Sequence, residues 1–334
     1  MQKTLLVTGG AGYIGSHAAV AFAQAGYKVV ILDNFANSGR ENLDGIAKIL
    51  GHEVDFFECD ITNRGALESI FEKYNFDGVL HFAGLKAVGE SCEKIGEYHE
   101  KNIFGSIVLF DVMEKFGVKK IIFSSSATVY NQKNLPPFTE NMPTGTTNPY
   151  GTSKFVIEKL IEDYVAHKNW QATSLRYFNP IGAHPSRFIG EIPRGVPNNL
   201  LPYIFDVALG KREKVRVFGD DYPTQDGSGV RDYIDINDLV DAHLLAYEHL
   251  QNGHEIFNVG TGKGTSVFEM IALVEKISDQ KIPYEVMPRR SGDLAIVFAS
   301  AQKITDKLGW KAKNSVEDAI VSGWNFIQKI HHDS

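Results

Sequence analysis

Cysteine is nearly absent from this sequence of 334 residues, which contains only Cys59 and Cys92. The two lie 33 positions apart, and neither belongs to a CxxC pattern or a Cys/His cluster. This spacing excludes a disulfide framework and a zinc site. We therefore expect no metal and a reducing, cytoplasmic location.

Long apolar runs and an excess of positive charge are missing as well. No stretch approaches the roughly 18 consecutive apolar residues of a membrane span, so we expect no membrane association. The opening residues MQKTLLVTGG lack a basic segment followed by an apolar one, and we expect no secretory leader. With 34 Lys and Arg against 41 Asp and Glu, the net charge is −7, which disfavours binding to nucleic acids.

The residues that are present are typical of a globular protein, with 43% apolar and 22% charged side chains in a length suited to about two domains. Short β-branched runs alternate with helical stretches in the first half, which predicts an α/β fold with a doubly wound, Rossmann-type parallel sheet. We expect strands at residues 4–8, 28–33, 53–59, 78–82, 120–124 and 172–177. A helix at residues 14–25, capped by Gly26, joins the first two.

The composition changes after Asn179, because residues 179–202 contain five prolines. We expect a long binding loop there, without regular structure, and a domain boundary at its start. Beyond this loop the pattern predicts a helix at residues 237–250, a strand at 255–259, and helices from about 266 and at 316–327.

Three glycines, Gly9, Gly12 and Gly15, follow the first expected strand and open the first expected helix. Glycine there permits a tight turn, close approach of a pyrophosphate and packing of helix on strand, while the helix N-terminus attracts the anion. Asp33 ends the second strand 21 residues after Gly12, where an acid can bind the adenosine ribose. The pattern predicts a dinucleotide site; the alternative is a turn cluster of glycines with Asp33 capping a strand.

The dinucleotide is expected to be NAD rather than NADP. Asn34 follows Asp33, and no arginine occurs before Arg40. A carboxylate without a neighbouring guanidinium repels a 2′-phosphate. Residues 260–266 (GTGKGTS) resemble a phosphate-binding loop only superficially, because Lys263 is followed by Gly264 rather than by Ser or Thr.

Tyr150 and Lys154 form a YxxxK pattern behind Asn148 and Pro149, which are typical of a helix start. The i, i+4 spacing places an ammonium beside a phenol, and positive charge favours the phenolate that can act as a base. Residues 124–126 form a serine run at the end of a strand, where a hydroxyl can share the reacting proton. An isolated YxxxK is more often a buried tyrosine and a solvated lysine, but here the dinucleotide motif accompanies it.

These motifs belong to a larger set that resembles the extended short-chain dehydrogenase/reductase family over nearly the whole chain. The segments are TGGAGYIGSH from Thr8, HFAGLKAVGES from His81, SSSATVY from Ser124, PYGTSK from Pro149, LRYFNPIGAHPS from Leu175, GVPNNLLPY from Gly195, GVRDYI from Gly229 and RRSGD from Arg289. The resemblance implies interconversion of UDP-galactose and UDP-glucose by C4 epimerisation, through a transient 4-keto intermediate, with tightly bound NAD in a homodimer.

The resemblance also implies a division into two domains. An NAD-binding Rossmann domain would comprise residues 1–178, rejoined by about 235–262. A smaller C-terminal α/β domain that binds the UDP-sugar would comprise residues 179–234 and 263–334.

By the same resemblance, the catalytic residues are Ser126, Tyr150 and Lys154. The cofactor contacts are Gly9, Gly12, Tyr13, Ile14, Gly15, Asp33, Asn34, Asp60, Ile61, Phe82, Ala83, Gly84, Lys86, Asn102, Ser124, Tyr150, Lys154, Tyr177 and Phe178. The substrate contacts are Ser126, Tyr150, Asn179, Asn199, Leu200, Phe218, Arg231, Arg290, Asp293 and Val297.

The chemistry of the substrate residues agrees with this assignment. Arg231 and Arg290 can hold a pyrophosphate through planar guanidinium forks, whereas Asn179 and Asn199 supply amide donors without charge. The alternative for each arginine is a surface salt bridge. Val297 matches the position at which, in this family, a bulky tyrosine rejects an N-acetylated sugar and small residues admit it. Valine is intermediate, and we expect UDP-N-acetylhexosamines to be accepted as well.

Two other functions remain as alternatives. A nucleotide-sugar 4,6-dehydratase or decarboxylase of the same family needs an acidic pair behind the strand-end hydroxyl, but Ser126 and Ala127 stand there. A catalytically inactive NAD sensor would be expected to lose the Tyr150 and Lys154 pair, and both are present.

Overall fold

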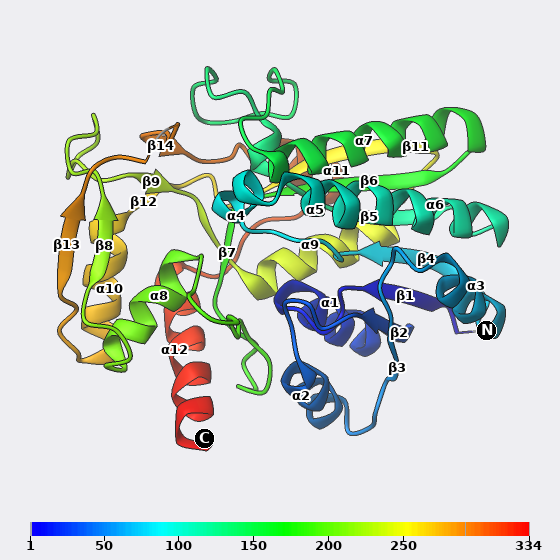
Figure 1. Ribbon diagram of the computed structural model, residues 1–334, viewed down its shortest axis with the longest axis horizontal. Coiled ribbons are helices and arrows are strands. Elements are labelled where there is room, and N and C mark those ends of the chain that lie inside the picture. Colours follow the sequence, from blue (N-terminus) through cyan, green and yellow to red (C-terminus); the bar gives the residue numbers. More distant parts are fainter. Residues whose placement is uncertain (1, 291, 334) are drawn as a thin grey trace.

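A computed structural model describes residues 2–290 and 292–333 of the chain. Its largest element is a parallel sheet of seven strands in the order β11-β6-β5-β4-β1-β2-β3 (Figure 1). The strands are β1 (Thr4–Thr8), β2 (Lys28–Asp33), β3 (Asp55–Glu58), β4 (Phe76–His81), β5 (Lys120–Ser126), β6 (Gln171–Tyr177) and β11 (Gly253–Val259). The predicted Rossmann-type α/β fold is confirmed. The strand order reverses between β1 and β4, and ligands of such sheets bind at this point.

Helices cover both faces of the large sheet (Figure 1). They are α1 (Tyr13–Gln24), α2 (Arg40–Leu50), α3 (Arg64–Lys73), α4 (Val88–Glu93), α5 (Ile95–Tyr98), the π-helix η1 (His99–Phe104), α6 (Gly105–Lys115), the 3₁₀ turn η2 (Ala127–Val129), α7 (Pro149–Lys168), α9 (Ile236–Glu248) and α11 (Gln302–Leu308). Because side chains alternate along a strand, β1 sends Leu5 and Val7 into the core beneath α1 and α9, and Leu6 into the core beneath α3, α6 and α7. Burial on both faces explains the nearly continuous apolar sequence of these strands.

The other elements, seen at the left of Figure 1, contain a third core. They are β7 (Asn179–Ile181), α8 (Leu200–Ala208), β8 (Val215–Phe218), β9 (Val230–Arg231), β10 (Tyr233–Asp235), β12 (Thr265–Ser266), α10 (Val267–Ser278), β13 (Tyr284–Met287), β14 (Ile296–Val297) and α12 (Val316–Asp333). Ile204, Met270, Ile320 and Trp324 join α8, α10 and α12 in this core. No helix in the described part of the chain is long and apolar enough to cross a membrane.

The loop expected at residues 179–202 has regular structure at its two ends. Asn179–Ile181 forms β7, which pairs with β10, and α8 begins at Leu200. The expectation of a wholly irregular segment was wrong at these two ends. Pro202 lies in the first turn of α8, where backbone N–H groups have no partner within the helix, so a proline costs no hydrogen bond. Residues 182–199 between them form the loop.

One buried ion pair fixes α7 on the sheet. Glu158 of α7 accepts hydrogen bonds from Arg176 of β6, Nε to Oε1 at 2.9 Å and Nη2 to Oε2 at 2.7 Å. The Ser125 hydroxyl of β5 donates to Oε1 at 2.6 Å. The side chains of Arg176 and Glu158 are only 4% and 1% exposed. Because a bidentate pair has one favourable geometry, it sets both the rotation and the height of α7 above the two strands.

We expect Glu158→Gln to lower the free energy of unfolding by about 3–5 kcal/mol, because it leaves a buried guanidinium without a countercharge. Urea denaturation of the two proteins measures the loss. Glu162→Gln is the matched control, since Glu162 pairs with Lys159 on the exposed side of the same helix and should cost less than about 1 kcal/mol. Equal losses from the two substitutions would contradict the role given to Glu158.

Candidate active site

The predicted site residues meet at the carboxyl ends of the strands, around one cavity of about 1640 Å³. Of all of them, only Asn102 does not line it. The predicted residues that line it are Gly9, Gly12, Tyr13, Ile14, Gly15, Asp33, Asn34, Asp60, Ile61, Phe82, Ala83, Gly84, Lys86, Ser124, Ser126, Tyr150, Lys154, Tyr177, Phe178, Asn179, Asn199, Leu200, Phe218, Arg231, Arg290, Asp293 and Val297.

The glycine loop between β1 and α1 leaves a cradle at the start of the helix. Gly9 has φ 71°, and a Cβ on it would lie 2.7 Å from the backbone nitrogen of Ala83. A Cβ on Gly15 would lie 2.2 Å from the Gly9 oxygen. Gly12 is the N-cap of α1 and provides no side-chain cap, so the first N–H groups of the helix face the cavity. This cradle fits a dinucleotide pyrophosphate.

Asp33 is held beside this cradle by three hydrogen bonds. Its carboxylate accepts from the backbone nitrogens of Ala11 at 3.1 Å and Phe35 at 2.9 Å, and from the Ser38 hydroxyl at 2.7 Å. The side chain is therefore a fixed acceptor at the edge of the cavity, which suits a ribose hydroxyl and repels a 2′-phosphate.

Asp60 forms a second polar cluster at this end of the cavity. Its carboxylate accepts hydrogen bonds from the Thr62 backbone and hydroxyl, from Asn34 Nδ2 at 2.9 Å and from Lys101 Nζ at 3.0 Å. Burial alone would raise the pKa of Asp60, but the hydrogen bonds from Thr62, Lys101 and Asn34 outweigh it and lower the pKa to about 2.

Asn102 lies behind the loop that follows β4 and holds it in place. Its Oδ1 accepts from the Leu85 nitrogen at 2.8 Å, and its Nδ2 donates to the Leu85 oxygen at 3.0 Å and to Ser153 Oγ at 2.9 Å. Asn102 thus ties the β4 loop to α7 through the π-helix η1. Asn102 therefore supports the residues that line the cavity, and its contact with a cofactor stays a prediction.

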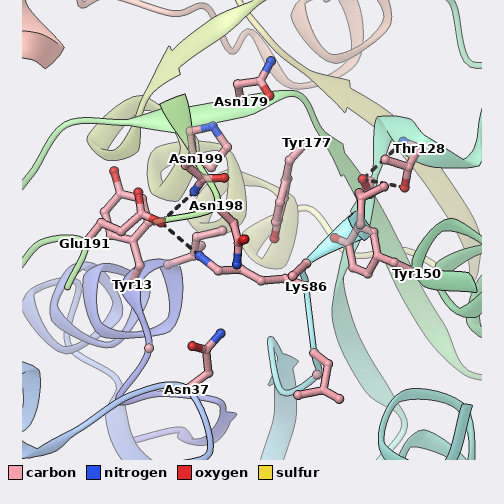
Figure 2. A pocket seen from close by; sticks show the side chains of 18 of the residues that line it. Tyr13, Asn37, Lys86, Thr128, Tyr150, Tyr177, Asn179, Glu191, Asn198 and Asn199 are labelled. Atoms are coloured by element: carbon pink, nitrogen blue, oxygen red, sulfur yellow. Dashed lines mark hydrogen bonds and ion pairs between the residues drawn. The ribbon is translucent and has the colours of Figure 1, made fainter. Parts of the chain in front are cut away.

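Ser126 lies beside Tyr150 in the cavity, and its hydroxyl influences the pKa of the Tyr150 phenol. Thr128 donates to Ser126 Oγ from its hydroxyl at 3.0 Å and its backbone nitrogen at 3.2 Å (Figure 2). The serine oxygen accepts both of these hydrogen bonds, which leaves its own proton available for another acceptor. Burial raises the pKa of the Tyr150 phenol, and the hydrogen bond from Ser126 acts in the opposite direction. Thr128 was not predicted as a site residue, although it lies two residues after Ser126 in the same motif.

Lys154 lies one helical turn beyond Tyr150, as the spacing predicts. Its Nζ is 5.8 Å from the centroid of the Tyr150 ring and donates to the Ser124 backbone oxygen at 2.6 Å. Burial lowers the pKa of Lys154 to about 7, against an opposing effect of the Glu158 carboxylate. The ammonium is thus held near its titration point beside a phenol that needs a positive neighbour to ionise.

Tyr177 closes the wall behind the catalytic cluster. Its hydroxyl contacts His243 Nε2, while His243 Nδ1 lies 2.8 Å from the Leu239 oxygen. Since Nδ1 must donate to that carbonyl, Nε2 of the neutral ring accepts the Tyr177 proton. Burial lowers the pKa of His243 to about 4, which keeps the ring neutral. His243 was missed because it reads as an ordinary residue of a helix.

The opposite end of the cavity carries the predicted substrate residues. Arg231 pairs with Asp293, and the Arg290 guanidinium lies 3.9 Å from the centroid of the Phe218 ring. Asn179 Nδ2 donates to the Asp232 oxygen at 3.2 Å. Both guanidinium groups line the same cavity, where they can hold a pyrophosphate.

Between the two ends, Lys86 and Asn199 contact the same carboxylate (Figure 2). Glu191 Oε1 accepts from Lys86 Nζ at 3.0 Å and from Asn199 Nδ2 at 2.6 Å. Glu191 was missed because nothing in the proline-rich loop marks it.

Val297 lies on β14, which pairs with Val230 and Arg231 of β9, so its side chain is fixed beside the substrate end.

The loop at residues 260–266 binds an internal carboxylate. Asp232 accepts from the backbone nitrogens of Thr261 at 2.8 Å and Gly262 at 3.0 Å. The N–H groups that could have received a phosphate are therefore already bonded. Across residues 2–290 and 292–333, no group of three or more His, Cys, Asp or Glu side chains could hold a metal ion.

Asp60 provides a test by pH. Its pKa is about 2 in the fold and 3.8 ordinarily, so the ionised group stabilises the fold above about pH 4, and this contribution is lost as the pH falls towards 2. We expect the difference in unfolding free energy between the wild type and Asp60→Asn to shrink by about 1–2 kcal/mol from about pH 5 to pH 2.5, measured by urea denaturation. A difference that does not vary with pH would contradict this.

Comparison with known proteins agrees with the geometry. The model of the NAD dependent epimerase/dehydratase family matches residues 5–260. A UDP-glucose 4-epimerase of Bacillus subtilis is 48% identical over 325 residues, which cover 96% of either chain. The crystal structure of a UDP-glucose 4-epimerase from Bifidobacterium longum, in complex with NAD⁺ and UDP, is 47% identical with a TM-score of 0.95, covering 98% of each chain.

A more distant structure is that of a UDP-Glc/GlcNAc 4-epimerase from Campylobacter jejuni. It is 33% identical with a TM-score of 0.85, covering 98% of this chain and 99% of its own. The resemblance that the motifs predicted is confirmed. With a match over most of its length and close relatives across all of it, the chain belongs to the NAD dependent epimerase/dehydratase family.

Proposed function

We propose that this chain interconverts UDP-galactose and UDP-glucose by epimerisation at C4, through a transient 4-keto sugar. The observation that carries the proposal is the position of Ser126, Tyr150 and Lys154 in a single cavity, between the glycine cradle and the two arginines. A nucleotide cofactor and a nucleotide sugar can therefore meet at one phenol.

NAD fits the end of the cavity that contains the glycine cradle. The N-terminus of α1 would hold its pyrophosphate, and Asp33 its adenosine ribose. Bound there, NAD⁺ supplies the redox chemistry, because it removes a hydride from C4 of the sugar and later returns it. The relatives agree, since the Bifidobacterium longum enzyme was crystallised with NAD⁺ and UDP.

The protein's own part in the chemistry is to move one proton. Tyr150 takes the proton of the sugar 4-hydroxyl and gives it back after the 4-keto sugar has turned over. Ser126 lowers the pKa of the phenol, and the Lys154 ammonium favours the phenolate.

The other end of the cavity would hold the UDP group. Arg231 and Arg290 would hold the pyrophosphate, with Asn179, Asn199, Leu200 and Phe218 around the rest of the nucleotide. Most of the binding energy must come from these contacts, because a sugar held as firmly as the nucleotide could not present its second face.

We also propose the division into two domains given above, with one refinement. Ile304 and Trp310 pack in the core beneath α1 and α9, so the segment around α11 belongs with the NAD-binding part.

We further propose a cytoplasmic homodimer. Ile95 and Phe104, near α5 and η1, are each about half exposed, as expected of an apolar face covered by a second copy. Sedimentation at the mass of a monomer would contradict the dimer.

The proposed reaction is tested with Tyr150→Phe. We expect turnover of UDP-galactose to fall by about 10²–10⁴-fold, because the acid–base group is lost, while UDP affinity is unchanged. Tyr203→Phe is the matched control, since Tyr203 lines the same cavity without a proposed role. Wild-type formation of UDP-glucose without added NAD⁺ supports the epimerase; a 4-keto-6-deoxy product indicates a dehydratase, and no conversion indicates an NAD sensor.

The width of the sugar pocket is tested with Val297→Tyr. We expect the wild type to epimerise UDP-N-acetylgalactosamine, and the tyrosine to lower kcat/KM for it by about 10-fold or more through steric exclusion. Turnover of UDP-galactose by the same variant serves as the control and should change little. Strict rejection of the N-acetylated sugar by the wild type would overturn the argument from Val297.

A further inference from the structure

Glu191 is a carboxylate in a cavity that, on the proposed function, receives two pyrophosphates. Its side chain is only 12% exposed, and the proposed reaction gives it no role. A negative charge there opposes the binding of anionic ligands unless neighbouring hydrogen-bond donors or cations compensate it. Figure 2 shows that these neighbours are Lys86 and Asn199.

Two segments of the chain meet at one atom here, because Glu191 and Asn199 both belong to the loop at residues 182–199 and Lys86 belongs to the loop after β4. Lys86 Nζ and Asn199 Nδ2 both donate to Glu191 Oε1, at 3.0 Å and 2.6 Å. We call this arrangement the Glu191 bridge. It joins a predicted cofactor residue to a predicted substrate residue.

Asn199 shows that the bridge is a preferred contact. It occupies the N-cap of α8, where an asparagine side chain ordinarily accepts a hydrogen bond from its own helix. No such bond is made here, and the amide is turned to Glu191 instead. The side chain therefore bonds to a residue of its own loop rather than to the first turn of α8.

The loop that carries Glu191 is tied down at a second point. Arg194 Nη2 contacts Glu41 of α2 at 2.7 Å, with both side chains about half exposed. The loop thus crosses from the substrate end to the elements around the glycine cradle and contacts two of them. Between these two contacts, residues 191–194 line the cavity.

We propose that Glu191 is a positioning residue that couples the two nucleotide sites. Oε1 is shared between two donors, so a UDP group that takes the Asn199 amide leaves this oxygen to Lys86 alone. The contact between Lys86 and Glu191 then strengthens, because the carboxylate oxygen is no longer shared with a second donor. The loop closes more firmly on the β4 segment, and the cofactor beneath it is released more slowly.

Thermodynamic linkage requires the coupling to act on both ligands, UDP and the cofactor. If UDP slows the loss of the cofactor by lowering the free energy of the doubly liganded state, the cofactor must tighten UDP by the same factor. The coupling rests on the proposed function, since it requires both nucleotides to bind where the site residues place them.

The experiment uses the purified holoenzyme and UDP, which carries no sugar and undergoes no turnover. Exchange of the bound cofactor for isotopically labelled NAD⁺ is followed with and without saturating UDP. We expect UDP to slow exchange by at least about fivefold in the wild type, and by less than about twofold in Glu191→Gln, whose neutral amide cannot form the ion pair. UDP affinity, measured by calorimetry in each protein, separates a failure of coupling from a failure of UDP to bind.

Two further variants complete the test. Lys86→Met breaks the Glu191 bridge from its other end and should lose the UDP effect in the same way, which keeps the test open if Glu191→Gln folds poorly. Arg194→Met is the matched control, because it removes the other tie of the same loop and should retain the slowing by UDP. No slowing by UDP in the wild type, full slowing in Glu191→Gln, or loss of the effect in Arg194→Met would each overturn the proposal.

Discussion

The buried pair between Glu158 and Arg176 determines where the chemistry of this protein can take place. It fixes α7 against β5 and β6, and α7 carries both Tyr150 and Lys154. The same carboxylate raises the pKa of Lys154, opposing the stronger effect of burial. One interaction between a helix and a strand therefore sets the position of the base and moderates the charge beside it. The Ser125 hydroxyl, bonded to the same carboxylate, links this pair to the serine run that ends at Ser126.

The cavity around this centre separates binding from chemistry. Groups that attract phosphate lie at its two ends, in the N-terminus of α1 and in Arg231 and Arg290, whereas the middle contains a phenol, a hydroxyl and an ammonium. Acidic side chains beside the ends are each bonded to donors, as Asp33 is to backbone N–H groups. An acidic protein can thus bind two anionic nucleotides, because its local geometry rather than its net charge determines the potential inside the cavity.

The sequence was most informative where the chemistry is local. The glycine loop, Asp33 and the Tyr150 and Lys154 pair are determined by short spacings within single strand and helix units, and their positions could be predicted. Contacts between segments that are distant in the sequence could not be predicted. Glu191 meets a lysine 105 positions away, and His243 meets a tyrosine 66 positions away, each by a side chain that no motif marks. Likewise, the hydrogen bonds of Asn102 to the backbone of Leu85 could not be predicted, because they depend on how the π-helical turn lies against the loop after β4.

The short pairing of β7 with β10 has a mechanical consequence. The chain leaves the large sheet through Asn179–Ile181 and returns to it through Tyr233–Asp235, and these two passages are hydrogen-bonded to each other as parallel strands. A further passage near Phe298 is bonded to Phe138 of the first part through its backbone. Several hydrogen-bonded passages therefore connect the two parts of the chain, which restrains rotation of one part against the other. A sugar that must show both faces to one phenol has to turn within the cavity.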